Sequence, residues 1–524
     1  MRAFAERSDD PELRSAVELA VIFAFCTLIF HVLANLYQAH LGYGYFRDEM
    51  YYLICGRHLA WGYVDQGPLV AVQARAGETL FGRSLVGLRL FASLAGAARV
   101  FLTGVLTWAL GGRRPAQGLA LVGVSLAPIY LGTDGVLAMN SFESLFWMGC
   151  LLTLILILRG GSPKLWLVFG ASAGVGVLNK PSMTFFLVAL LAALILTRQG
   201  RLLFSRWTAA GVLILLLFAM PNLLWQVHHH WPTLEFLQNG RLEHKNKALG
   251  VVPFLVTQIL DFNPATFLLW GAGLVWLFRD RSWRWLGATF ALFLAGMMAL
   301  HAKDYYVAPI YPILFAAGGV AWERRSGKRS RVLEGRWWAF PILESTIVLS
   351  GLLILPMSTP ILTPAAWVAY AKTLHLYGAA SNSENEASGV LPQFYADRFG
   401  WQEEVDRVQQ IAESLSPEDR KQLLILCSNY GEASAINFLG RGLPPAVSGH
   451  NNYFLWGPGL ASGDVAILIE DSTAEHLHQF YDRVEIAGRI GTTYSMPYEH
   501  RNIYLLRGRK FDLRAMWPKK KNYI

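Results

Sequence analysis

The sequence predicts a mainly α-helical polytopic membrane protein with a C-terminal α/β domain on its outer face. Of its 524 residues, 53% are hydrophobic and only 16% are charged, and the mean hydropathy is +0.33. Soluble domains usually carry about 25% charged residues, so this deficit indicates a membrane protein. Long apolar segments fill the chain only as far as residue 362. We therefore divide it into a transmembrane domain, 1–362, and an extracytoplasmic α/β domain, 363–524.

Eleven apolar segments of the first part are candidates for membrane spans. A spanning helix needs about 20 mostly apolar residues, and several of these segments are shorter. They lie at 16–37, 85–110, 118–131, 136–158, 165–178, 184–197, 207–227, 264–278, 285–300, 305–322 and 338–356. The first lacks a small-residue cleavage site, so we expect it to remain as a helix rather than to be removed as a signal peptide.

The distribution of basic residues predicts the orientation. If the N-terminus is cytoplasmic, the segments that fall inside are short and rich in Arg and Lys, and the densest is 324–336. The segments that fall outside hold fewer basic residues and carry most carboxylates, histidines and lysines able to do chemistry. Because cytoplasmic loops are enriched in Lys and Arg, we expect the N-terminus inside and, with eleven spans, the C-terminal domain outside.

The charge and the metal-ligand inventory exclude some function classes. The formal charge of +9 does not indicate nucleic-acid binding, because the basic residues are spread over short segments between apolar runs. The four cysteines show no metal-binding spacing. Three consecutive histidines, His228, His229 and His230, lie beside Trp225 and Trp231. Neighbouring helix residues point in different directions, so we favour interfacial anchoring and predict no metal ligand.

Short strand and helix patterns alternate in the C-terminal part. Segments 422–428, 464–470 and 502–506 predict buried strands, and 401–415 and 431–439 predict helices. Residues 381–386 have the composition of a surface linker. Two polar and aromatic segments, 428–432 and 449–457, would suit a sugar ligand, although turn and packing roles are the commoner explanation.

The stretch 45–69, the first segment predicted on the outer face, is too polar to lie in lipid. It places two adjacent carboxylates, Asp48 and Glu49, beside Arg47 and several tyrosines. Carboxylates next to a bilayer are costly unless they have partners or remain in water. One of them could act as a general base toward a hydroxyl. The alternative is an ordinary hydrated loop, and the flanking pattern decides between the two.

The flanking pattern resembles a known family. Residues 46–52, FRDEMYY, and 62–69, GYVDQGPL, are similar to the first outer loop of protein O-mannosyltransferase-like enzymes. These form the polyprenyl-phosphate-sugar-dependent superfamily of GT-C fold, which includes the lipid A aminoarabinose transferases. Residues 301–312, HAKDYYVAPIYP, resemble the family's late outer loop, and 178–182, LNKPS, resemble its small turn with a lysine. The three motifs together cover the transmembrane domain.

The resemblance implies a glycosyltransferase of the plasma (inner) membrane. It would transfer a sugar from a polyprenyl-phosphate donor to a hydroxyl of a glycan, lipid or protein at the outer face, with inversion at the anomeric carbon. In the family, the aspartate of the Asp-Glu pair is the catalytic base; it maps onto Asp48, and Glu49 becomes its supporting neighbour. Such a leaving group requires no cofactor, and use of a divalent cation is left open.

The remaining predicted site residues would bind the donor or the acceptor. Cations near a lipid-linked phosphate stabilise it as it leaves. For each lysine, a role in topology alone is an equally open alternative. The residues predicted to bind substrate are Arg47, Tyr52, Arg57, His58, Asp65, Asn140, Glu143, Lys180, His301, Lys303, Tyr305 and Tyr306.

The chain departs from the family pattern at two positions. Asn140 stands where an acid is common, with Asp134 and Glu143 nearby. Asp134 is open to two roles, as a site carboxylate or as the cap of the following helix. Gln66 lies where the aminoarabinose transferases carry a basic residue, which leaves the donor unspecified. Arg99, deep in the second apolar segment, has no predicted partner.

Two other classes of function are alternatives: a transporter or lipid-linked-glycan flippase, and a binding protein for outer-face glycans. A transporter is expected to place polar residues at mid-depth in several helices and to show repeat symmetry. The sequence shows no internal repeat and, at mid-depth, only Arg99. We therefore expect the enzyme.

Overall fold

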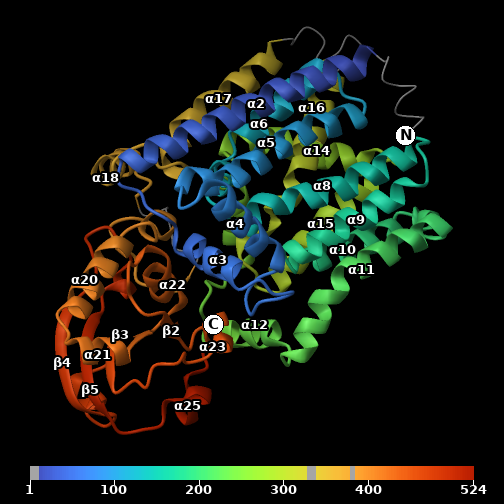
Figure 1. Ribbon diagram of the computed structural model, residues 1–524. Helices are drawn as coiled ribbons and strands as arrows, with labels where there is room; N and C mark the ends of the chain where they lie inside the picture. The colour runs from blue at the N-terminus through green and yellow to red at the C-terminus, as the bar shows by residue number, and fades with distance from the viewer. Residues whose placement is uncertain (1–10, 327–337, 378–383) are drawn as a thin grey trace. The chain divides into compact units, whose positions relative to one another are not determined.

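The computed structural model describes residues 11–326, 338–377 and 384–524, which form two compact units (Figure 1). The first unit comprises Met1–Tyr37, Val86–Leu224 and Ala248–Ile361, and the second comprises Gln38–Leu85, Trp225–Lys247 and Leu362–Ile524. The second unit thus joins the predicted C-terminal domain to two segments from the first part of the chain. Outside the described residues lie 1–10, most of the basic run 324–336, and residues 381–383 of the predicted linker.

The first unit is built from helices, of which α2 and α11 end in the second unit. They are α2 (Pro11–His40), α5 (Leu85–Ala109), α6 (Arg114–Ser125), α7 (Pro128–Thr133), α8 (Met139–Leu158), α9 (Leu165–Asn179), α10 (Ser182–Leu196), η1 (Gly200–Leu203), α11 (Arg206–His228), α13 (Val251–Leu260), η2 (Pro264–Thr266), α14 (Phe267–Arg279), α15 (Arg284–Ala299), η3 (Asp304–Ile310), α16 (Tyr311–Ser326) and α17 (Ala339–Ser358).

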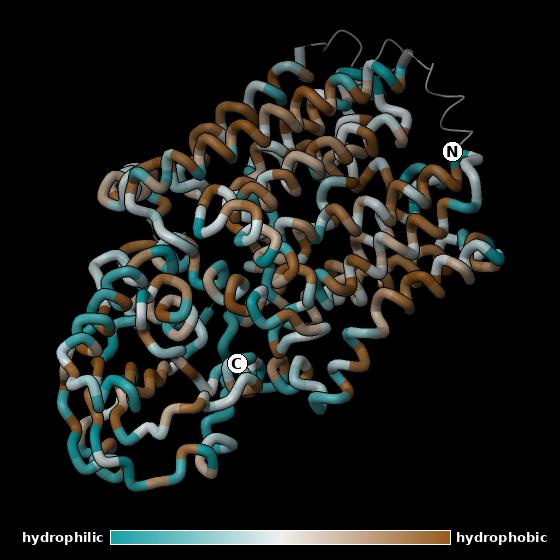
Figure 2. The backbone as a smooth tube through the Cα atoms, viewed as in Figure 1, coloured by the Kyte–Doolittle hydropathy of each residue, from teal (hydrophilic) through white to brown (hydrophobic). Residues whose placement is uncertain are grey.

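Six spans of the described chain are long and apolar enough to cross a bilayer: α2, α5, α8, α11, η3 with α16, and α17. Helices α13 and α14 pass the same test as a pair bent by 101°, and α9, α10 and α15 are shorter apolar helices. Figure 2 shows the apolar residues along α2, α11 and α17. A mostly helical chain with several apolar helices is therefore confirmed. The count of eleven spans and the inside position of the N-terminus stay predictions.

Two of the expected spans differ in the structure. Segment 118–131 is not one helix but two, α6 and α7, because Pro128 lacks an N–H and holds Ala127 in extended backbone, with φ −78° and ψ 120°. Segment 264–278 is preceded by an apolar helix, α13, that we did not predict. The two are separated at Asn263, whose φ is +66°, and Pro264 follows.

Small and aromatic residues hold the helices of the first unit together. A Cβ at Gly273 would lie 2.4 Å from the carbonyl oxygen of Leu314, so only glycine lets α14 and α16 approach this closely. Trp147 of α8 stacks on Phe186 of α10 at 4.3 Å between ring centroids and meets Phe293 of α15 edge-on at 4.9 Å. These contacts pack α14 against α16 and α8 against α10 and α15.

The second unit contains a five-stranded mixed sheet, which confirms the predicted small α/β domain. Its strands are β1 (Leu423–Cys427), β2 (Ala446–Ser448), β3 (Val465–Glu470), β4 (Tyr481–Arg489) and β5 (Asn502–Arg509), in the order β2-β1-β3-β5-β4. β1 is parallel to β2 and β3, and β5 is antiparallel to β3 and β4. Three of these strands were predicted. β2 is too short to show a pattern, and β4 has few buried positions.

The second unit also contains helices. The predicted helices 401–415 and 431–439 are α20 and α22. In full, the helices of the second unit are α3 (Arg47–Arg57), α4 (Pro68–Phe81), α12 (Pro232–Leu242), α18 (Pro364–Thr373), α19 (Gln393–Ala396), α20 (Trp401–Glu413), α21 (Pro417–Gln422), α22 (Tyr430–Leu439), α23 (Asn452–Trp456), α24 (Ala474–Leu477), η4 (Pro497–Glu499), α25 (Leu513–Met516) and η5 (Trp517–Lys520).

The stretch 45–69 is not the loop we predicted, because most of it forms helix α3 and the start of α4. Glu49 is the third residue of α3, and its side-chain Oε2 accepts a hydrogen bond from the backbone N–H of Phe46 at 2.9 Å, which caps the helix. Pro68 begins α4, where a missing N–H costs nothing. The helical geometry places Asp48 in the first turn of α3.

Candidate active site

Asp48 is a partly exposed carboxylate held by one strong donor. Its side chain is 30% exposed, and the hydroxyl of Tyr430 donates a hydrogen bond to its Oδ1 at 2.8 Å. Nε of Arg47 lies 3.7 Å from the same oxygen. A carboxylate in the first turn of a helix also faces the positive end of the helix dipole. The predicted base is therefore oriented and reachable.

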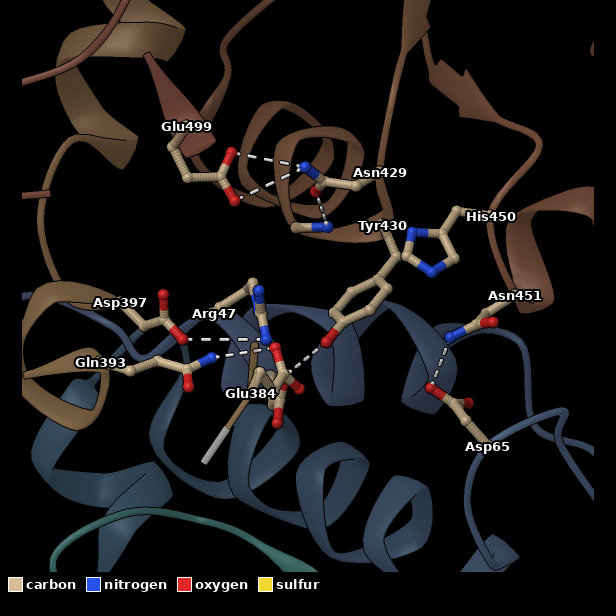
Figure 3. A network of polar contacts seen from close by, with 12 residues as sticks. Arg47, Asp65, Glu384, Gln393, Asp397, Asn429, Tyr430, His450, Asn451 and Glu499 are labelled. Atoms are coloured by element: carbon tan, nitrogen blue, oxygen red, sulfur yellow. Dashed lines mark hydrogen bonds and ion pairs between the residues drawn. The ribbon is translucent and has the colours of Figure 1, made fainter. Parts of the chain in front are cut away.

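Arg47 is the centre of a buried polar network (Figure 3). Its Nη1 donates to the hydroxyl of Tyr498 at 2.5 Å, and its Nη2 lies 3.8 Å from Oδ2 of Asp397. The hydroxyl of Tyr498 donates in turn to Oδ1 of Asp397 at 2.9 Å. Burial raises the pKa of Asp397 from 3.8 to about 7, although Arg47 opposes this effect. The network fixes the guanidinium beside Asp48.

Glu49 and Tyr52, both predicted at the site, are buried. The carboxylate of Glu49 caps α3 through Phe46, so its observed contact supports the helix that carries Asp48. Burial raises the pKa of Tyr52, with the neighbouring carboxylate of Asp48 adding to the effect. Tyr52 is therefore a neutral phenol in the folded protein.

Asp65 belongs to a second polar cluster, which draws in the C-terminal domain. Its Oδ1 accepts from the hydroxyl of Tyr51 at 3.1 Å and its Oδ2 from Nδ2 of Asn451 at 2.9 Å. Nδ2 of Asn452 donates to the hydroxyl of Tyr51 at 2.6 Å. Burial raises the pKa of Asp65 to about 6. The polar segment 449–457 thus contacts the first-loop residues directly.

Arg57 and His58, at the end of α3, make contacts that join α3 to its neighbours. Nη2 of Arg57 lies 2.6 Å from Oε1 of Glu78, and its Nη1 donates to the carbonyl oxygen of Asn437 at 3.2 Å. The His58 ring stacks on Trp456 at 4.6 Å between centroids. A phosphate would have to compete with Glu78 for Arg57.

A cavity of about 870 Å³ adjoins Arg47 and Tyr430. Its wall includes the residues that follow three parallel strands: 428–430 after β1, 449–450 after β2 and 471–472 after β3. The carboxyl edge of parallel strands is where open α/β sheets bind ligands. The rim includes 243–245 and 384–386, which are joined by a hydrogen bond from the N–H of Asn385 to the carbonyl oxygen of Lys245 at 2.9 Å.

In the first unit, the structure brings four predicted residues together around Lys180. Its Nζ donates to Oδ1 of Asn140 at 2.6 Å and lies 3.0 Å from Oε2 of Glu143. Ser182 donates to the other oxygen of Glu143. The ammonium lies 4.2 Å from the ring centroid of Tyr306. Asn140 and Glu143 therefore form one buried charged cluster with the lysine of the turn 178–182.

The late-loop residues lie at and near this cluster. The ring centroid of Tyr305 lies 5.9 Å from Nζ of Lys180, and Tyr305 lines a cavity of about 10 Å³ together with Asn140 and Glu143. His301 is exposed and has a φ of +50°. Lys303 takes extended backbone at the start of η3 and is partly buried.

Arg99 has a partner that the sequence did not reveal. Its guanidinium makes two hydrogen bonds to the carboxylate of Asp134, one of them 3.0 Å long, and it lies 3.8 Å from the ring centroid of Tyr130. Nε2 of His31 lies 3.7 Å from Oδ2 of Asp134. Asp134 therefore does not cap the following helix, whose N-cap residue is Ala138 and has no side-chain capping hydrogen bond. The capping alternative was wrong because the buried guanidinium of Arg99 donates hydrogen bonds to the carboxylate of Asp134.

Of the three consecutive histidines, His229 contacts an aromatic neighbour, and its ring also meets that of His228 at 5.0 Å between centroids. The His229 ring stacks on Trp225 at 4.2 Å, and His229 Nδ1 lies 2.9 Å from the carbonyl oxygen of Trp225. Across the described ranges, the structure shows no group of three or more His, Cys, Asp or Glu side chains arranged to hold a metal ion. Metal dependence stays a prediction.

Sequence reasoning missed Tyr430, Tyr498 and Asp397 as neighbours of the first-loop residues. The segment 428–432 was noted for its composition, but packing was preferred there. The C-terminal segment offered no motif for the other two residues, because they reach Arg47 only through the tertiary fold.

Comparison with known proteins supports the expected relationship. Residues 65–225 match the family model described as dolichyl-phosphate-mannose-protein mannosyltransferase, a match that begins after Asp48. The crystal structure of ArnT from Cupriavidus metallidurans in the apo state is similar, with a TM-score of 0.64, 17% identity, and coverage of 94% of this chain and 98% of that one. The same protein bound to undecaprenyl phosphate gives a TM-score of 0.58, 16% identity, and coverage of 93% and 98%. A search of curated protein sequences gives no match. The resemblance to GT-C glycosyltransferases is confirmed by the family model and by the fold.

Proposed function

We propose that the protein is an integral-membrane glycosyltransferase that moves a sugar from a polyprenyl-phosphate donor to a hydroxyl acceptor. The proposal places the reaction at the outer face of the plasma membrane. Three findings support it: the fold shared with ArnT over nearly the whole chain, the structure of that protein with undecaprenyl phosphate, and the family-model match. The observation that carries it is the geometry of Asp48.

Asp48 has the properties of a general base. It is partly exposed, it receives a hydrogen bond from Tyr430, and it adjoins the partly buried cation of Arg47. In the proposed step, its carboxylate removes the proton of the acceptor hydroxyl. The hydroxyl oxygen then bonds to the anomeric carbon as the bond from that carbon to the phosphate oxygen breaks. The polyprenyl phosphate leaves with the electron pair, and the configuration inverts.

The departing phosphate needs cations, and the Lys180 cluster is our first choice. An ammonium has three N–H donors. Within the described chain, Asn140 and Glu143 take two of them, which leaves one for a phosphate oxygen. Lys303 and His301, from the late loop, are the other proposed contacts. Arg57 is the weaker candidate because Glu78 already neutralises it.

The test is Asp48→Asn in the full chain, reconstituted in lipid with labelled polyprenyl-phosphate sugars and cell-envelope glycans. Loss of a general base is expected to reduce transfer by about 10²–10⁴-fold. The protein yield and the thermal unfolding midpoint should stay at wild-type values. Asp406→Asn, an exposed position of α20, is the matched control and should transfer normally. Near-normal transfer by Asp48→Asn would refute the assignment.

A further inference from the structure

The cavity at the carboxyl edge of β1, β2 and β3 is not lined by Asp48, but residues that contact Asp48 line it. Two of its wall residues, Arg47 and Tyr430, contact Asp48. A molecule in the cavity therefore lies against the same two side chains that orient the proposed base. At about 870 Å³, the cavity falls within the size range of small-molecule sites, about 300–1,000 Å³.

The lining of this cavity is polar and nearly balanced in charge. A cleft lined by charges of one sign attracts a ligand of the opposite sign. Among the described residues, this wall carries no excess of positive charge. A phosphorylated ligand is therefore not attracted by the net charge of the cavity. Its cationic residues are Arg47, Lys245, Arg501 and Lys520, and its acidic residues are Glu243, Glu384, Glu386, Glu470 and Asp471.

The uncharged part of the lining fits hydroxyl groups better than a hydrocarbon chain. Ser428, Asn429 and Ser472 supply hydroxyl and amide groups, which both donate and accept. The aromatic side chains of Tyr430 and Tyr498 also line the cavity. Few apolar side chains line the cavity, and Leu426 and Leu468 are among them. A polyprenyl chain would therefore find little apolar surface there.

We infer that this cavity binds a neutral saccharide, the sugar portion of the acceptor. The assignment of the saccharide as acceptor rests on the proposed function. The saccharide contacts Tyr430 and Arg47, and the hydroxyl to be glycosylated belongs to the same molecule. This narrows the acceptor from any glycan, lipid or protein to one that presents an uncharged sugar.

The inference is tested by saturation-transfer NMR on the full chain in lipid nanodiscs. The probes are cellobiose, maltose and N,N′-diacetylchitobiose, with glucose 6-phosphate as the phosphorylated comparison. Asp471→Trp fills the cavity from the end of β3. Glu475→Trp removes the same charge from an exposed position of α24, four residues later, and serves as control. If Asp471→Trp does not fold, Lys520→Trp fills the cavity from η5.

We expect at least one disaccharide to bind wild-type protein and Glu475→Trp, and the filling variant to weaken that binding about ten-fold or more. The inference is overturned if none of the three binds, if both tryptophan variants bind equally, or if glucose 6-phosphate binds the cavity more tightly.

Asp48→Asn separates this inference from the proposed function. Saccharide binding with normal transfer by Asp48→Asn would refute the catalytic assignment and leave the sugar site standing. Lost transfer by Asp48→Asn without saccharide binding to wild-type protein would refute the sugar site and leave the catalytic assignment standing.

Discussion

The hydroxyl of Tyr430 donates a hydrogen bond to Asp48 across 382 residues of sequence. Asp48 is the second residue of helix α3, near the start of the chain, and Tyr430 begins helix α22 after the first strand of the sheet. The α/β domain thus contacts the segment 45–69 that carries the Asp-Glu pair. This domain supplies the hydroxyl group, from Tyr430, that donates a hydrogen bond to the proposed base. Together with Arg47, it also forms much of the wall of the adjoining cavity.

Tyr430→Phe should slow transfer while leaving the chain folded. The change removes one hydrogen bond to a charged carboxylate, worth about 1.5–3 kcal/mol, so we expect a loss of about 10–100-fold. If Tyr430 positions the base, the loss should fall on kcat at saturating donor. The measurement is the rate of polyprenyl phosphate release by reconstituted protein.

Tyr377→Phe is the matched control for this prediction. Tyr377 lies in the same unit, and its hydroxyl donates to the carbonyl oxygen of Val390 at 2.9 Å. Its loss should leave kcat unchanged. Equal rates for Tyr430→Phe and wild type would show that the Asp48–Tyr430 contact has no part in the reaction.

The local parts of the site could be predicted because they depend on short spacing. The Asp-Glu pair, the Lys-containing turn and the late-loop tyrosines each occupy a few consecutive residues. The structure places Lys180 against Asn140, Glu143 and Tyr306. The strands of the sheet were predicted where buried runs of five or six residues leave a clear pattern, as in β1 and β3.

The rest depends on partners that local pattern does not encode. Arg99 was unexplained because Asp134 lies 35 residues away and approaches it only when α5 and the end of α7 pack together. The segment 45–69 was expected to be a loop because its polarity suggested water. Its polar side chains instead form hydrogen bonds with residues of the α/β domain, and these contacts stabilise helix α3. Tertiary contacts here override the local signal.

Removing either partner of the Lys180–Glu143 pair should destabilise the chain. Both side chains are buried, and Lys180→Met leaves Glu143 as an uncompensated buried charge, at a cost of about 3–5 kcal/mol. The thermal unfolding midpoint should fall. The double variant Lys180→Met with Glu143→Gln removes both charges and should recover most of the loss.

The same double variant tests the proposed phosphate contact of Lys180. With the fold restored but the cation gone, transfer should remain impaired. If transfer recovers together with stability, Lys180 is a structural residue and the phosphate is held elsewhere.

Gly96→Ala should destabilise the first unit through the buried Arg99–Asp134 pair. A Cβ at Gly96 would lie 2.1 Å from Oδ2 of Asp134, so the carboxylate must move and lose its arginine. Breaking a buried ion pair costs about 3–5 kcal/mol. Gly118→Ala is the control, because its Cβ meets open space in helix α6, and it should stabilise by about 0.5–1 kcal/mol. Midpoints that shift in the same direction would contradict the prediction.

Asp397 should make the stability of the protein fall as pH rises. Burial raises its pKa from 3.8 to about 7 in the folded chain. Between these values the folded state binds more protons than the unfolded state, so the free energy of unfolding decreases with rising pH and levels off for this group above about 7. Asp397→Asn cannot titrate, so its thermal unfolding midpoint should fall less than that of wild type from pH about 4 to about 8.

Asp65 and Glu432, whose pKa values burial also raises, to about 6 and about 8, contribute slopes of the same sign in both proteins. The difference between the two profiles therefore isolates Asp397, and Asp406→Asn should follow wild type. Parallel profiles for wild type and Asp397→Asn would mean that Asp397 is already ionised across this range, with Arg47 outweighing its burial.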